Sequence, residues 1–111
     1  MKNKYVYIAG PYTHPDPVEN THKVIQVADY LMQFGFSPYV PHMNIIWHLV
    51  IPHDPDFWYK YDLEWLKKCD CLLRLSGKSL GADEEVKFAK ELGIPVYYTT
   101  DELLWFSGAN S

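Results

Sequence analysis

Apolar residues along the chain form two kinds of pattern, and each pattern predicts a different secondary structure. Short apolar runs bounded by Gly or Pro predict buried strands, whereas apolar residues at every third or fourth position predict amphipathic helices. Asp16 followed by Pro17 and Glu19 is a helix start signal, and Gly35 and Gly93 are typical helix ends. The pattern predicts strands at 5–9, 36–40, 69–75 and 95–98, and helices at 17–34, 57–68 and 79–92.

The order of these elements, strands alternating with helices, predicts one α/β domain. Such a chain forms a parallel sheet with helices on both faces, and its ligands bind at the carboxyl ends of the strands. We expect residues 1–106 to form this domain and residues 107–111 to form a loose tail. The segment 41–56 has weak periodicity, and connections of that length are usually functional or partly helical.

Two acidic residues fall on helix faces that are otherwise apolar. Asp62 shares its face with Trp58 and Leu66, and Glu85 shares its face with Ala89. A carboxylate there must be paired, hydrogen-bonded or protonated, and such acids concentrate in active sites. Both helices flank the third strand, so the two acids can converge at one end of the sheet. The alternative is that each acid lies half solvated at the mouth of its helix and caps a loop.

The segment 76–82 follows a buried strand and opens a helix, where backbone N–H groups and the helix dipole receive anions. Ser79 and Gly81 are the candidate contacts. The segment lacks the Gly-x-x-x-x-Gly-Lys-Ser/Thr spacing of a Walker loop, so it does not predict an ATPase. Taken alone, a serine in this position is most often a simple helix N-cap.

The composition excludes several classes of protein. The 111 residues are 48% hydrophobic and 22% charged, as in globular domains, and no apolar run reaches the ~20 residues of a membrane helix. A net charge of −4, with scattered basic residues, argues against a nucleic-acid polymer as partner. The N-terminus has no signal-peptide pattern, so we expect a cytoplasmic protein. Cys69 and Cys71 are expected to be buried, reduced thiols.

The five histidines do not predict a metal site, because their spacing fits no standard zinc pattern. His42 directly follows the second predicted strand and is therefore a site candidate at the carboxyl edge of the sheet. Surface or packing positions are expected for His14, His22, His48 and His53.

Four short motifs stand in a recognisable order: Tyr7-Ile8-Ala9-Gly10-Pro11-Tyr12, Pro41-His42, Tyr61-Asp62-Leu63-Glu64-Trp65-Leu66, and Ser79-Leu80-Gly81 with Glu85 and Ala89. Over residues 5–98 the chain resembles the nucleoside 2-deoxyribosyltransferase superfamily, and its last two motifs are most similar to 2′-deoxynucleoside 5′-phosphate N-hydrolases. The resemblance implies a flavodoxin-like (Rossmannoid) sandwich with a mainly parallel four- to five-stranded sheet.

The resemblance also implies chemistry at an N-glycosidic bond, without a metal or cofactor. Glu85 matches the nucleophile that attacks the anomeric carbon, and Asp62 matches the acid that helps the base leave. Tyr7 matches a tyrosine that orients the nucleophile. Ser79 matches a phosphate-binding serine of the hydrolases, which favours a nucleoside monophosphate, and His42 matches a histidine near the base.

The remaining substrate-binding residues that the resemblance implies are Gly81 and the loop Gly10-Pro11-Tyr12. In the hydrolases a serine and an arginine of this loop touch the ligand. Pro11 and Thr13 stand in their places here, which leaves phosphate affinity and base choice open.

Members of the superfamily complete their sites across a subunit interface, so the resemblance implies a homodimer or larger homo-oligomer. We expect Trp105, Phe106 and part of the segment 47–58 to lie between subunits. Asn110 is the tail residue expected to reach the neighbouring site. The alternative is that Trp105 and Phe106 cover the sheet edge of a monomer.

The principal hypothesis is an enzyme that cleaves the N-glycosidic bond of a nucleoside or nucleoside 5′-monophosphate, or exchanges its base. A non-catalytic nucleotide-binding or sensing module of the same fold is the first alternative, and a structural or interaction protein is the second. The first two differ in whether Glu85 is needed for turnover or only for binding.

Overall fold

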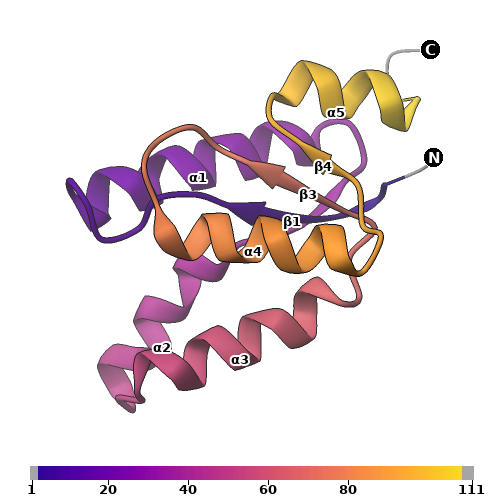
Figure 1. Cartoon of the computed structure of the whole chain (residues 1–111). Helices are drawn as coiled ribbons and strands as arrows, with labels where there is room; N and C mark the ends of the chain where they lie inside the picture. Colours follow the sequence, from indigo (N-terminus) through magenta and orange to yellow (C-terminus); the bar gives the residue numbers. More distant parts are fainter. Residues whose placement is uncertain (1–2, 109–111) are drawn as a thin grey trace.

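Four parallel strands lie at the centre of the molecule (Figure 1). The computed structural model describes residues 3–108. The strands are β1 (Tyr5–Ala9), β2 (Ser37–Tyr39), β3 (Cys71–Arg74) and β4 (Val96–Tyr97), and their order in the sheet is β2-β1-β3-β4. Every neighbouring pair is parallel. The predicted α/β class and parallel sheet are confirmed, with four strands.

Helices cover both faces of this sheet, as predicted. In chain order they are α1 (Pro17–Met32), the 3-10 helix η1 (Pro41–Met43), α2 (Asn44–Val50), α3 (Pro55–Leu66), α4 (Leu80–Glu91) and α5 (Thr100–Ser107). The buried side chains of α1 and α5 pack on one face, and those of α3 and α4 pack on the other (Figure 1). Each strand is therefore buried on both sides.

Strand β1 shows how the alternation of side chains divides the core. Val6 and Ile8 face α1 and α5, whereas Tyr7 and Ala9 face α3 and α4, and all four are at most 1% exposed. A tyrosine with no exposed surface needs a partner for its hydroxyl group. The alternation thus directs one polar group of β1 toward the helices that carry the two unusual acids.

The helix ends follow the predicted local signals. The Asp16 side chain accepts hydrogen bonds from the backbone of Val18 and Glu19, and Gly35 follows α1 with φ +91°. The helix predicted at 57–68 is observed two residues earlier, at Pro55–Leu66, because Pro55 occupies its first turn. Strand β1 has its predicted bounds, whereas β2, β3 and β4 are shorter than predicted, because their apolar runs extend into the adjoining loops.

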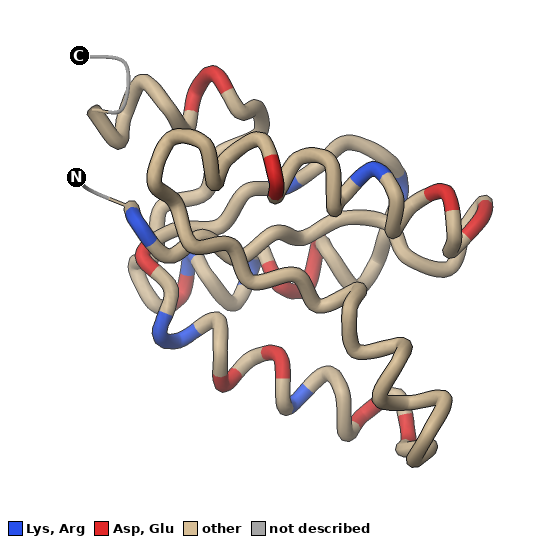
Figure 2. Tube along the Cα trace, turned by 180° about the vertical axis from the view of Figure 1, so that it is seen from behind, with Lys and Arg blue, Asp and Glu red and all other residues tan. Residues whose placement is uncertain are grey.

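The segment 41–56 is largely helical, since it contains η1, α2 and the start of α3. None of the residues of α2 is buried. The helix is apolar around most of its circumference, so its sequence lacks the contrast between faces that reveals an amphipathic helix. No Lys, Arg, Asp or Glu occurs from residue 40 to residue 53, and the corresponding part of the trace is uniformly tan in Figure 2.

The chain after β4 forms α5, where the sequence predicted only an apolar segment. Ser107, which we assigned to the tail, is the last residue of α5 and is 2% exposed. Its Oγ accepts a hydrogen bond from Asn3 Nδ2 at 3.0 Å, so the ordered domain extends past the predicted boundary at residue 106. Asn110 lies outside the described residues. Within residues 3–108 no helix is long and apolar enough to cross a bilayer.

Both thiols are free, as expected, but they differ in burial. Cys71 on β3 is fully buried, whereas Cys69 is only partly buried. Burial raises the pKa of both thiols, which keeps them protonated at neutral pH.

Candidate active site

The carboxyl ends of β1 and β3 form the switch point of the sheet. The chain leaves β1 toward β2 on one side and leaves β3 toward β4 on the other, which opens a crevice between the two loops. The loops approach closely: a Cβ on Gly77, whose φ is +117°, would lie 2.7 Å from Pro11 Cγ. Glycine is required at position 77 by both its backbone conformation and this contact.

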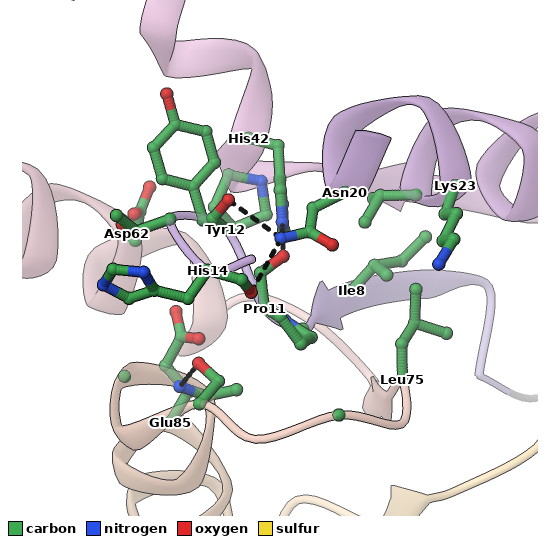
Figure 3. A pocket seen from close by; sticks show the side chains of 18 of the residues that line it. Ile8, Pro11, Tyr12, His14, Asn20, Lys23, His42, Asp62, Leu75 and Glu85 are labelled. Atoms are coloured by element: carbon green, nitrogen blue, oxygen red, sulfur yellow. Dashed lines mark hydrogen bonds between the residues drawn. The ribbon is translucent and has the colours of Figure 1, made fainter. Parts of the chain in front are cut away.

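A cleft of about 1910 Å³ opens at this switch point (Figure 3). Ordinary ligand pockets are roughly 300–1,000 Å³, so the cleft is a broad, open groove. The residues on its wall that the sequence predicted for the site are Gly10, Pro11, Tyr12, His42, Asp62, Ser79, Gly81 and Glu85. The structure therefore brings together residues from four separate segments of the chain.

Glu85 projects from α4, and Tyr7 holds it from the sheet. The Tyr7 hydroxyl, fully buried under the helix, donates a hydrogen bond to Glu85 Oε2. Burial raises the pKa of Glu85 to about 7, the hydrogen bond from Tyr7 opposes this shift, and the nearby Asp62 adds to it. The carboxyl group thus exchanges its proton near neutral pH.

Asp62 projects from α3 and is 9% exposed. Its Oδ1 accepts hydrogen bonds from the Tyr39 hydroxyl at 2.9 Å and from Asn44 Nδ2 at 2.8 Å. Burial raises the pKa of Asp62 to about 6, and the two hydrogen bonds act in the opposite direction. Two acids with shifted pKa values in one cleft have the properties expected of a proton donor and a nucleophile.

Two buried side chains hold the loop after β1. His42, 6% exposed, donates from Nε2 to the Pro11 carbonyl at 2.8 Å, and its ring contacts Tyr12 edge to face. Asn20 Nδ2 donates to the carbonyls of Tyr12 and His14, each at 3.0 Å (Figure 3). Burial lowers the pKa of His42, and its Nδ1 is the one buried side-chain nitrogen or oxygen without a partner among the described residues. His42 therefore shapes the cleft wall as a neutral imidazole.

The start of α4 forms the opposite wall. Ser79 caps the helix, since its Oγ accepts from the backbone N–H of Ala82 at 3.1 Å, and a Cβ on Gly81 would meet nothing within 4 Å. Arg74, buried at the end of β3, braces this region: it donates to the carbonyls of Leu75 and Gly77 and forms an ion pair with Asp83 at 3.0 Å. The loop that leads into α4 is thus held in one conformation.

Three histidines assigned to the surface or to packing also line the cleft, namely His14, His48 and His53. Figure 3 shows the His14 side chain pointing toward the space between Asp62 and Glu85. His48 has a packing role, because its Nδ1 accepts from Trp58 Nε1 at 2.9 Å. His22 is exposed. Within residues 3–108, no group of three or more His, Cys, Asp or Glu side chains is arranged to hold a metal ion.

Comparison with known families decides where this chain belongs. Residues 4–99 match the model of a family described as a domain of unknown function, DUF7768. The chain belongs to this family. No curated protein matches this DUF7768 domain.

Solved structures similar to the DUF7768 domain include two 2-deoxyribosyltransferases. The enzyme from Bacillus psychrosaccharolyticus is 24% identical with a TM-score of 0.61, and the match covers 83% of this chain and 69% of that enzyme. The enzyme from Leishmania mexicana is 22% identical with a TM-score of 0.64, covering 84% of this chain and 61% of that enzyme. The domain therefore has the deoxyribosyltransferase fold but spans less than two thirds of the Leishmania enzyme.

Sequence reasoning missed four polar residues of the DUF7768 site: Asn20, Tyr39, Asn44 and Arg74. Arg74 had a detectable signal, because a charged residue inside a buried apolar strand needs partners. Asn44 had none, since it lies in a segment without periodicity. None of these residues is among the site residues that the sequence motifs indicated. Their side chains donate hydrogen bonds to residues that line the cleft.

Proposed function

We propose that the DUF7768 domain cleaves the N-glycosidic bond of a nucleoside or nucleoside 5′-monophosphate, or exchanges its base. One observation carries the proposal: Glu85 and Asp62, from two different helices, line one cleft with pKa values raised to about 7 and about 6. Such a pair supplies a nucleophile and a proton donor, the set that retaining glycosidases use. Two proteins that share the fold are 2-deoxyribosyltransferases, and this supports the same class of chemistry for the DUF7768 domain.

The proposed reaction proceeds in two steps, formation of a bond between Glu85 and the sugar and then its hydrolysis. A Glu85 carboxylate oxygen attacks C1′ of the sugar, and the bond from C1′ to the base nitrogen breaks with its electron pair going to the base. Asp62 gives its proton to the departing base. Water then attacks C1′, the bond to Glu85 breaks, and the proton released from the water returns to Asp62. A second base that attacks in place of water gives base exchange.

The start of α4 is the proposed site for a 5′-phosphate. The Ser79 hydroxyl, the open backbone at Gly81 and the cleft-lining Lys78 together offer donors and positive potential there. Pro11 and Thr13 supply no cation on the opposite loop. The proposed substrate is therefore a nucleoside 5′-monophosphate, with phosphate contacts limited to one wall.

Ser79→Asp should weaken binding of a nucleoside monophosphate by about 10- to 100-fold, because a carboxylate repels the phosphate that the hydroxyl would bind. Aspartate is also a good N-cap, so α4 should stay folded. Titration calorimetry with a monophosphate and with the matching nucleoside measures the difference. Equal affinity changes for the two ligands would argue against a phosphate site at α4.

The decisive assay for the function is incubation with the common nucleosides and their 5′-monophosphates, followed by chromatography for free base. Release of base that stops in the Glu85→Ala variant supports the proposal. Binding without release, unchanged in that variant, would favour a non-catalytic nucleotide-binding module.

The domain is also proposed to form a homodimer or larger homo-oligomer, with Trp105 and Phe106, which are 72% and 59% exposed, and part of the segment 47–58 in the interface. Helix α2 is the part of that surface with the clearest apolar character. Ile46, Leu49 and Val50 on this helix are 62%, 71% and 75% exposed, and the segment from 40 to 53 has no charged side chain. An apolar, uncharged helix is matched by a second copy of itself, as in an isologous interface. Because Asn44 and His48 of α2 also line the cleft, a partner there would cover its open side.

Leu49→Glu should therefore convert the assembly into a 13.0 kDa monomer in light scattering at micromolar concentration. Val18→Glu, at an equally exposed apolar position on α1, is the matched control and should leave the assembly unchanged. A wild-type protein that is already monomeric and fully active would contradict this arrangement. The expected contribution of Asn110 to a neighbouring site stays a prediction.

A further inference from the structure

We infer that Tyr39 and Asn44 are positioning residues that fix the carboxyl group of Asp62 so that its transferable proton is held on Oδ2. The inference rests on the proposed function, since it concerns how the proton donor of that reaction is oriented. Neither residue belongs to the motifs that the sequence displays.

Tyr39 is the strand partner of Tyr7. The two residues are opposite each other in the register of β1 and β2, and their rings stack with centroids 5.5 Å apart at 27°. The other neighbour of Tyr39 is Trp65, stacked at 5.6 Å and 19°. A ring enclosed by two others has little rotational freedom, so its hydroxyl group is fixed.

The two tyrosines serve the two acids in the same way. Tyr7 donates to Glu85 on α4, and Tyr39 donates to Asp62 on α3. The pleat places both side chains on one face of the sheet, beneath the cleft. Tyr39 is not on the cleft wall, so it acts on a ligand only through Asp62. A neighbouring pair of strand residues thus holds both acids from below.

Asn44 completes the orientation of Asp62. Its amide nitrogen donates to Oδ1, the same oxygen that accepts from Tyr39. An amide nitrogen can donate but cannot accept, so Oδ1 acts as an acceptor and a proton on the carboxyl group belongs on Oδ2. No hydrogen bond to Oδ2 occurs among the described residues, which leaves this oxygen free to serve a ligand.

The other titratable groups around Asp62 are Glu85 from α4, Tyr7 from β1 and His14 from the loop after β1, whose side chain points toward the space between the two acids (Figure 3). No salt bridge to Asp62 occurs within residues 3–108. The two donors on Oδ1 are therefore the groups that stabilise its carboxylate form against burial. Because Asn44 opens α2, the position of this exposed helix is tied directly to the proton donor.

Tyr39→Phe and Asn44→Ala test this inference on the full chain. Tyr39→Phe keeps both ring stacks and removes only the hydroxyl. The Asp62 carboxyl is followed by NMR titration of protein labelled with ¹³C at the aspartate carboxyl carbon, and its signal is assigned by its absence in Asp62→Asn. Each variant should shift the Asp62 midpoint upward, and the double variant should shift it further. Tyr61→Phe, next in sequence to Asp62, is the control and should leave the midpoint unchanged.

In the cleavage assay, the acidic limb of the kcat profile should move to higher pH in Tyr39→Phe, because Asp62 has the lower pKa of the two acids, with KM within about twofold of wild type. A purely structural role would lower the melting temperature without moving the limb. Unchanged Asp62 midpoints in both folded variants would overturn the inference. The NMR result stands without turnover: shifted midpoints with no cleavage of any substrate would refute the proposed function and leave the positioning intact.

Discussion

Replacing Glu85 with glutamine should lower the rate of N-glycosidic cleavage by at least about 10³-fold, because the amide cannot form the bond to C1′. Glutamine keeps the size of the side chain and still accepts a hydrogen bond from Tyr7. Glu84→Gln, one residue away and exposed, is the matched control and should retain full activity. Single-turnover assays for free base measure both variants. A glutamine variant with near wild-type turnover would remove Glu85 from the mechanism.

The same substitution should stabilise the fold above neutral pH. Folding raises the pKa of Glu85 from 4.5 to about 7. Ionising this carboxyl group therefore destabilises the folded protein, and the free energy of unfolding falls as pH rises through this range. At pH 8 glutamine removes that cost, and we expect the free energy of unfolding to rise by roughly 1–2 kcal/mol. At pH 4, where the native carboxyl is protonated, the difference should vanish. Thermal unfolding at the two pH values tests this sign.

Asp62→Asn should lower the rate by roughly 10²–10⁴-fold, the contribution of a general acid. The loss should be largest for substrates whose base leaves poorly, since these depend most on the proton. Asp56→Asn on the same helix, paired with Lys60 at the surface, is the matched control and should have no effect. Rates with a series of bases measure the dependence, and a loss that is equal for all of them would argue against proton donation.

The pH profile supplies a second test of Asp62. With carboxyl pKa values of about 6 for Asp62 and about 7 for Glu85, the pair holds one proton between these values, mostly on Glu85. The reactive form, with the proton on Asp62, is the minor one, but its population is also largest in this range. Wild-type activity should therefore be bell-shaped with its maximum there. Below this range both acids are protonated and the nucleophile is lost. Above it both are ionised and the proton donor is lost. In Asp62→Asn the alkaline limb due to the donor should disappear.

The sequence predicted those features of the site that depend on local periodicity. Asp62 and Glu85 stand out because each interrupts an apolar helical stripe, and both line the cleft in the structure. Ser79 was recognisable as the start of a helix, and it caps α4. In each case the relevant interaction lies within a few residues along the chain, so the pattern of residue types is sufficient to reveal it.

Interactions between distant segments were beyond such reasoning. Tyr39 and Asp62 are 23 residues apart, and Tyr7 and Glu85 are 78 apart. The resemblance suggested the second pair, but no pattern suggested the first. Which tyrosine hydroxyl reaches which acid depends on the pairing register of β1 and β2. No residue pattern in the chain between these two strands predicts that register. Helix α2 was missed for a related reason, because an apolar helix without a polar face has no periodic contrast.

The sequence by itself determined that this is an α/β chain with two acids on buried helix faces and an anion-friendly helix start. Hydrophobic periodicity and capping are local properties, and they are encoded by neighbouring residues. Only the tertiary structure decided that β1 and β2 place Tyr7 and Tyr39 side by side, and that Asn44 joins them at Asp62. Strand pairing and crossover packing bring these groups together, and the chemistry of the cleft follows from that long-range geometry.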